Sequence, residues 1–139
     1  MAELTLRLIT PDAIVLDTQV TSVQVPATDG LLGILPRHAP LVTALNVGPL
    51  TYEADGKRES VFVSSGFAEV RDNTVRVVSE AGEPPAEIDE ERALDAEKRA
   101  RRHLDEARVP GAPQIDVVRA LGALRRAQWR LRIRSGKRL

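Results

Sequence analysis

The stretch GEPPAEID, residues 82–89, separates two parts of the chain whose hydrophobic patterns differ. Before this stretch, apolar and polar residues alternate, which predicts half-buried β-strands. Beyond it, apolar residues recur at a spacing near 3.6, which predicts amphipathic helices. The two consecutive prolines of the stretch cannot continue a helix, and they stiffen the connection. We therefore expect a β domain over residues 1–84 and a helical domain over residues 85–139.

The first part consists of short apolar runs separated by residues that favour turns. Leu4, Leu6 and Leu8 alternate with polar residues, and similar pairs of valines follow along the chain. Turn residues stand between the runs at Pro11-Asp12, Asp29-Gly30, Gly48-Pro49, Asp55-Gly56 and Asp72-Asn73. Many short strands at regular spacing predict an antiparallel β-sandwich.

The second part predicts two alanine-rich helices joined by RVPGAPQ, residues 108–114, where proline and glycine stop the first helix. We expect one stripe of Ala93, Ala96 or Glu97, Ala100, Leu104 and Ala107 to pack against a second stripe of Val117, Ala120, Leu121, Leu124, Ala127 and Leu131. The fold class is therefore α+β in two parts, with a β-sandwich followed by an antiparallel helical hairpin.

A heptad of similar sequence occurs twice, as IDEERAL at residues 88–94 and as IDVVRAL at residues 115–121. Asp89 and Asp116 are good N-cap residues, so both copies predict helix starts. The arginine of each copy faces the positive end of the helix dipole, which is unfavourable unless an anion compensates. Neighbouring acids can supply that charge, which would leave the arginines in surface ion pairs. Alternatively, Arg92 and Arg99 share one helix face and form a two-pronged anion site.

The composition argues against several classes of function. The formal net charge is zero and only four residues are aromatic, which disfavours a general nucleic-acid surface. There is no cysteine and no glycine-rich phosphate loop, so arginines would have to hold any nucleotide. His38 and His103 lie in different parts, and neither stands in a metal-binding or nucleophile motif. We expect a soluble protein on the cytoplasmic side that is not an enzyme and binds no metal.

The C-terminal helix is strongly basic, because no acidic residue follows Asp116. Its basic residues are Arg119, Arg125, Arg126, Arg130, Arg132, Arg134, Lys137 and Arg138. Such a helix is steered toward an acidic protein surface. Two alternatives remain at this point: a solvated helix end whose cations suit the dipole, and a nucleic-acid-binding module that uses this helix.

Three motifs follow one another ahead of the second helix: DGLLGILPRHAPL at residues 29–41, SGFAEV at 65–70 and IDEERA at 88–93. In this order, and with an alanine-rich hairpin, they resemble the epsilon-subunit family of bacterial F-type ATP synthases, along nearly the whole chain. The last motif marks an ATP site in some members. Gly122 differs from members with an arginine there, and Leu31 differs from the acid of many relatives.

The resemblance implies a noncatalytic rotor subunit, peripheral to the cytoplasmic side of a bacterial membrane and in contact with the membrane only through its complex. The β-sandwich would bind the gamma subunit and the c-ring through Leu31, Leu32, Arg37 and His38. The hairpin would either fold back or extend into the alpha and beta catalytic subunits and block ATP hydrolysis. Its contacts there would be Arg125, Arg130, Arg132 and Arg134.

The resemblance also implies that ATP is a regulatory ligand that favours the folded hairpin, with no other cofactor and no nucleic-acid partner. By position, the ATP contacts would be Glu83, Ile88, Asp89, Arg92, Ala93, Arg99 and Arg126.

Overall fold

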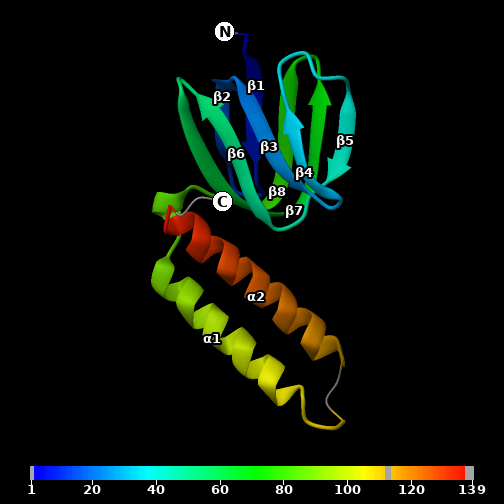
Figure 1. Cartoon of the computed structure of the whole chain (residues 1–139), viewed down its shortest axis with the longest axis vertical. Coiled ribbons are helices and arrows are strands. Elements are labelled where there is room, and N and C mark those ends of the chain that lie inside the picture. Colours follow the sequence, from blue (N-terminus) through cyan, green and yellow to red (C-terminus); the bar gives the residue numbers. More distant parts are fainter. Residues whose placement is uncertain (1, 112–113, 137–139) are drawn as a thin grey trace. The chain divides into compact units, whose positions relative to one another are not determined.

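The computed structural model describes residues 2–111 and 114–136, except for the side chains of residues 114–116 (Figure 1). The chain divides into two compact units, Met1–Pro84 and Pro85–Leu139. The first unit contains eight strands among its described residues, and the second contains a short 3₁₀ turn and two helices. The predicted fold class, a β-sandwich followed by a helical hairpin, is confirmed.

The strands pair in the order β2-β1-β8-β7-β6-β3-β4, and β5 pairs with β7. Their bounds are β1 Leu4–Ile9, β2 Ile14–Val20, β3 Ser22–Ala27, β4 Gly30–Ile34, β5 Leu41–Ala44, β6 Gly48–Ala54, β7 Lys57–Arg71 and β8 Thr74–Glu83. Neighbours are antiparallel with one exception, since β1 and β8 are parallel. The sequence predicted an antiparallel sandwich, and among the described strands this prediction is wrong for the β1–β8 pair alone.

The long strand β7 takes part in both layers of the sandwich because it bends in the middle. Its first half pairs with β6 and its second half pairs with β5. At the bend, Ser65 and Gly66 both have positive φ, and a Cβ at Gly66 would overlap the carbonyl oxygen of Val78. Only glycine fits this position, so the glycine of the SGFAEV motif is required for steric reasons.

The core lies between the two layers, and the bend changes which residues of β7 face it. Val61 and Val63 are buried before the bend, whereas Ala68 and Val70 are buried after it. The alternation therefore shifts by one residue at Ser65-Gly66. The other main contributions come from Leu4, Leu6, Leu8, Val23, Val25, Ile34, Leu50, Val75 and Val77.

Two of the predicted turns are tight two-residue hairpins. Asp55-Gly56 joins β6 to β7 and Asp72-Asn73 joins β7 to β8, with positive φ at all four residues. This is the geometry that matches the twist of paired strands. Gly48-Pro49 is not a turn, contrary to the prediction, but begins β6. Proline is tolerated there because β3 pairs only with the end of β6 beyond it.

The second unit consists of η1 Pro85–Glu87, α1 Glu90–Glu106 and α2 Gln114–Arg134. Asp89 caps α1 as predicted, because its side chain accepts a hydrogen bond from the backbone N–H of Arg92 at 3.0 Å. The prediction that Asp116 caps the second helix is wrong, since α2 already begins at Gln114. A carboxylate suits the first turn of a helix as well as its N-cap, so the sequence alone does not separate the two positions.

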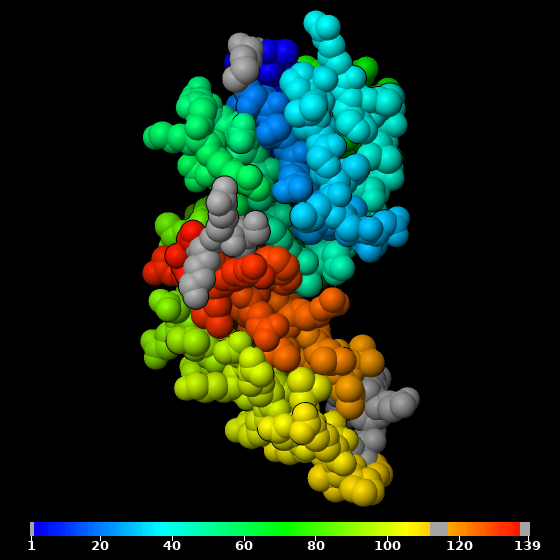
Figure 2. Space-filling model, viewed as in Figure 1, coloured from blue at the N-terminus to red at the C-terminus, as the bar shows by residue number. Residues whose placement is uncertain are grey.

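The two helices lie side by side and antiparallel (Figures 1 and 2). The fully buried seam residues are alanines at heptad spacing, Ala93 and Ala100 on α1 and Ala120 and Ala127 on α2. Leu121 does not belong to this seam as predicted, because it is 47% exposed. One residue past Ala120 is a rotation of about 100°, which carries the Leu121 side chain away from α1.

Candidate anion site and partner-contact surfaces

Each seam alanine follows an arginine directly, so the dipeptide Arg-Ala occurs four times, at residues 92–93, 99–100, 119–120 and 126–127. Equivalent positions of two antiparallel helices are related by a twofold axis normal to the plane of the pair. The residues that precede the seam alanines therefore lie on one side of the hairpin. We call this surface the arginine side, and it consists of Arg92, Arg99, Arg119 and Arg126.

The four side chains of the arginine side are exposed and form no ion pair with any residue that the structure describes. Other arginines of the hairpin do form such pairs, each with an acid three or four residues away. They are Arg101 with Glu97, Arg102 with Glu106, and Arg108 with Asp105, with N–O distances of 3.6, 4.0 and 4.0 Å. The arginine side thus carries four guanidinium groups that form no ion pair with a described acid, and guanidinium groups can bind an external anion.

The side chain of Arg126 extends toward the N-terminus of α2 and approaches Gly122. A Cβ built on Gly122 would lie 3.3 Å from Nη1 of Arg126. The guanidinium therefore occupies the surface that a larger residue at position 122 would cover. This placement brings it toward the turn of α2 that carries Arg119.

The other predicted nucleotide contacts differ in which of their atoms a ligand could reach. The side chains of Ile88 and Ala93 are both 3% exposed, so only their backbone atoms could meet a ligand. Asp89 already accepts the capping hydrogen bond from Arg92. Glu83 is the last residue of β8 and belongs to the first unit, whereas the remaining predicted contacts belong to the second.

The predicted rotor contacts lie on β4 and in the loop that follows it. Leu31 is 64% exposed, whereas Leu32 is half-buried and packs against the core. In the loop, Arg37 has a φ of 65°, and its backbone N–H donates to Oδ1 of Asn73 at 2.9 Å. His38 donates from Nδ1 to the carbonyl oxygen of Ala39 at 2.7 Å. The loop is therefore anchored, and Leu31 is the apolar side chain of the set that it leaves uncovered.

The basic end of α2 is partly committed to contacts within its own unit. The guanidinium of Arg132 lies over the ring of Trp129, 5.3 Å from the centroid. Arg134 donates to the carbonyl oxygen of Pro85 at 3.4 Å. Arg125 is exposed, and Arg130 is half-buried and has a partner. These four arginines of the predicted inhibitory contact point in several directions around the helix.

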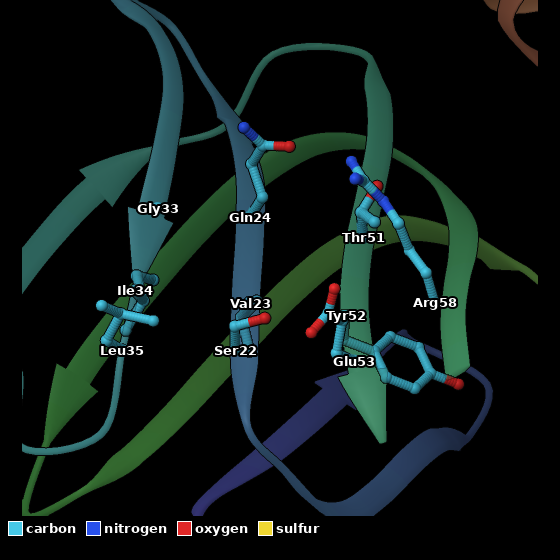
Figure 3. Close-up of a pocket in the computed structure, with 10 residues that line it drawn as sticks. All are labelled: Ser22, Val23, Gln24, Gly33, Ile34, Leu35, Thr51, Tyr52, Glu53 and Arg58. Atoms are coloured by element: carbon cyan, nitrogen blue, oxygen red, sulfur yellow. The ribbon is translucent and has the colours of Figure 1, made fainter. Parts of the chain in front are cut away.

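A shallow cavity of about 430 Å³ lies on the outer face of β3, β4 and β6 (Figure 3). Ser22, Gln24, Gly33, Thr51, Glu53 and Arg58 form its surface, with Leu35 at one end. None of the residues predicted for a site lines it. Glu53 and Arg58 are paired in the β6–β7 register, so opposite charges face each other and the cavity has no net preference for an anion.

The described residues contain no cluster of histidine, cysteine or acidic side chains that could hold a metal ion. No helix among them is long and apolar enough to cross a membrane. Within the described part of the chain, the arginine side is the arrangement best suited to a charged ligand.

The fold defines a class of two-domain proteins, in which a β-sandwich precedes a helical hairpin with alanines between its helices. Comparison with known proteins shows the family within this class. Residues 3–85 match the model "ATP synthase, Delta/Epsilon chain, beta-sandwich domain", and residues 86–135 match "ATP synthase, Delta/Epsilon chain, long alpha-helix domain". The chain belongs to the ATP synthase delta/epsilon chain family, as its motifs indicated.

Among similar proteins, the ATP synthase epsilon chain of Nitratidesulfovibrio vulgaris is 44% identical over 130 residues, 94% of each chain. That of Symbiobacterium thermophilum is 43% identical over 133 residues, 95% of this chain and 93% of the relative. A chain in the Euglena gracilis mitochondrial ATP synthase, solved as OSCP/F1/c-ring, superposes with a TM-score of 0.78 at 27% identity. The match covers 92% of this chain and 79% of that one.

Sequence reasoning missed two residues that the structure brings to these surfaces. Arg119 precedes a buried alanine as Arg92, Arg99 and Arg126 do, so the Arg-Ala repeat was a signal in the sequence that could have found it. Asn73 was assigned only to a turn, and nothing local in the sequence indicates that its side chain reaches the loop at Arg37.

Proposed function

We propose that this chain is a noncatalytic central-stalk subunit of an F-type ATP synthase and regulates ATP hydrolysis through its hairpin. The sandwich contacts the gamma subunit and the c-ring with Leu31, Leu32, Arg37 and His38. The chain is then peripheral to the cytoplasmic side of a bacterial membrane and meets the membrane only through the complex. Family membership and the bacterial relatives support this placement.

Regulation requires two arrangements of the hairpin that differ by only a few kcal/mol. An alanine seam suits such a switch, because burial stabilises by roughly 25 cal/mol per Å² and alanine buries little area. When the helices separate, Arg125, Arg130, Arg132 and Arg134 become free to meet acidic segments of the catalytic subunits. ATP hydrolysis is then inhibited.

ATP binding opposes this inhibition in the proposed mechanism. The observation that supports it is that Arg92 and Arg99 of α1 share one side of the hairpin with Arg126 of α2. A phosphate chain held from both helices binds the paired form and not the separated one. Such a ligand shifts the population toward the paired, non-inhibitory form. Glu83, Ile88, Asp89 and Ala93 complete the proposed contacts.

Calorimetry of the whole chain with ATP and ADP tests the nucleotide part of the proposal. We expect heat of binding with the unaltered chain and a strong loss with Arg92→Ala. Arg102→Ala, an exposed arginine paired with Glu106, serves as the control and should bind normally. Equal heats for all three proteins, or none, would reject ATP binding.

Add-back to an ATPase complex that lacks this subunit tests the inhibitory part. The full chain should lower ATP hydrolysis, and a chain that ends at Glu87 should not. If both chains inhibit equally, the hairpin is not the inhibitory element and the proposal fails.

A further inference from the structure

We propose that Arg119 is a fourth ligand-binding residue of the arginine side, and that this side takes a linear polyphosphate that joins α1 to α2. The ligand is either free tripolyphosphate or the phosphate chain of a nucleoside triphosphate, since the recognising chemistry is the same. This inference rests on the proposed nucleotide binding and adds a residue and a basis of selectivity to it.

The first argument is positional. Arg119 precedes the buried Ala120 as Arg126 precedes the buried Ala127, so the two arginines lie on the same side of α2 one heptad apart. Arg92 and Arg99 have the same relation on α1. Seven residues at 1.5 Å each separate the members of a pair by about 10 Å along the helix. The result is two rows of guanidinium groups facing the same way.

The second argument concerns charge. Like charges on one helix side repel each other, and an exposed arginine can pair with an acid three or four residues away. Three neighbours on this hairpin have done so, but Arg119, Arg126, Arg92 and Arg99 pair with no described acid. Asp89 accepts the capping hydrogen bond at the start of α1. Asp95, within one turn of both Arg92 and Arg99, forms an ion pair with neither. The side chain of Asp116, three residues before Arg119, lies outside the described residues. A multivalent anion relieves this repulsion, and planar guanidinium groups bind phosphate through paired hydrogen bonds.

The third argument is the open surface between Arg119 and Arg126. Gly122 lies between them and has no side chain, and Nη1 of Arg126 reaches to 3.3 Å from where its Cβ would stand. The other residue between them on that side, Ala123, has only a methyl group, so no long side chain of α2 separates the two guanidinium groups. A phosphate chain could contact both, together with Arg99 across the seam.

Selectivity follows from these contacts, because they involve phosphates and not a base. Affinity should fall in the order ATP, ADP and AMP, and tripolyphosphate should compete with ATP. Binding should also raise the melting temperature of the hairpin, because the ligand holds the two helices together.

The test is calorimetry of the full chain with ATP and with tripolyphosphate, on the unaltered protein, Arg119→Ala, Arg119→Lys and Arg101→Ala. Arg101 is the matched control, because it follows the buried Ala100 and so lies on the opposite side of the seam. Arg119→Ala should weaken both ligands about tenfold or more, the range for hydrogen bonds to charged groups. Arg119→Lys should recover part of this loss, and Arg101→Ala should bind normally.

The outcomes separate this inference from the proposed function. If Arg92→Ala weakens ATP but Arg119→Ala behaves like Arg101→Ala, nucleotide binding stands and the role of Arg119 is rejected. If the chain binds ATP but not tripolyphosphate, recognition depends on the nucleoside and the polyphosphate assignment is rejected. If Arg119-dependent binding of tripolyphosphate is found without inhibition of ATP hydrolysis, the inference stands and the regulatory proposal fails.

Discussion

Asn73 and Arg37 are joined by a hydrogen bond of 2.9 Å, from the backbone N–H of Arg37 to the side-chain oxygen of Asn73. The amide nitrogen of the same side chain donates to the carbonyl oxygen of Glu3 at 2.8 Å. One turn residue thus ties the loop after β4 and the start of the chain to the β7–β8 hairpin. Because Arg37 and His38 are proposed rotor contacts, the hydrogen bonds of Asn73 fix the conformation of that surface in the free chain.

The first prediction follows from this anchoring. Asn73→Gly keeps the positive φ of 58° without strain but removes both side-chain hydrogen bonds. We expect the sandwich to lose about 1–3 kcal/mol of unfolding free energy and the Arg37 amide to exchange faster with solvent. Denaturant unfolding and hydrogen exchange measure the two effects.

Asp55→Gly is the control for Asn73→Gly, since Asp55 also has a positive φ in a two-residue turn and its side chain makes no described hydrogen bond. It should leave exchange at Arg37 unchanged. If the Arg37 amide exchanges with solvent at the same rate in both variants, the side chain of Asn73 does not anchor the loop.

A second prediction concerns the bend of β7. Ser79 is 2% exposed, and its hydroxyl donates to the carbonyl oxygen of Ser64 at 2.9 Å and accepts from the Ser64 N–H at 3.0 Å. Ser79→Ala leaves two buried backbone groups without partners, so unfolding should become easier by about 1–3 kcal/mol. Ser22→Ala, whose hydroxyl makes no described hydrogen bond, should change stability by less than about 0.5 kcal/mol. Equal effects in a denaturant titration would contradict the assigned role.

The third prediction is a dependence of stability on alkaline pH. Burial raises the pKa of Tyr52 above its usual value of 10.0, and the charge of Glu59 opposite it on β7 raises the pKa further. The folded state therefore holds the phenol proton more tightly than the unfolded state. The resulting stability is complete below pH 10 and is lost as the pH rises through the folded pKa.

Tyr52→Phe removes this titration while keeping the ring, which packs against the core. The difference in unfolding free energy between the two proteins should be constant below about pH 10 and should then shift in favour of the phenylalanine variant. Glu59→Gln should make this fall in stability smaller and end it at a lower pH, because removing the Glu59 charge brings the folded pKa of Tyr52 closer to 10.0. A difference that stays constant up to pH 11 or so would show that the phenol does not titrate differently on folding.

Much of the fold could be predicted because local chemistry and tertiary structure agree. The Asp55-Gly56 and Asp72-Asn73 turns and the Asp89 cap need only their own neighbours, and each was predicted correctly. The Gly48-Pro49 turn failed because the same residues fit the start of a strand that lacks a partner on one side. The parallel β1–β8 pair depends on contacts between the two ends of the domain, which no local pattern encodes.

The site followed the same rule. Arg92 and Arg99 were predicted to share a face because they lie seven residues apart on one helix, whereas Arg126 was predicted only from the family resemblance. The exposed Arg119 precedes a buried alanine as these three arginines do. The approach of Arg126 to Gly122 could not be predicted, since it depends on a side-chain conformation. The burial of Ala93 agrees with its place in the predicted stripe, whereas the burial of Ile88 was not predicted. Burial limits both residues to backbone contacts with a ligand.

The last prediction tests the alanine seam on which the proposed switch depends. Ala100 is 2% exposed and Ala127 is 1% exposed, so the seam has no room for a larger side chain. Ala100→Leu should force the helices apart and lower the stability of their pairing by about 1–3 kcal/mol. Leu121→Ala is the contrasting change, because Leu121 is 47% exposed and should cost well under the 2–5 kcal/mol of a buried leucine. Helical circular dichroism during thermal unfolding gives both values.

In the ATPase add-back, Ala100→Leu should also inhibit more strongly than the native chain, since separated helices are the inhibitory form. Weaker inhibition by Ala100→Leu would mean that the paired hairpin is itself the inhibitor.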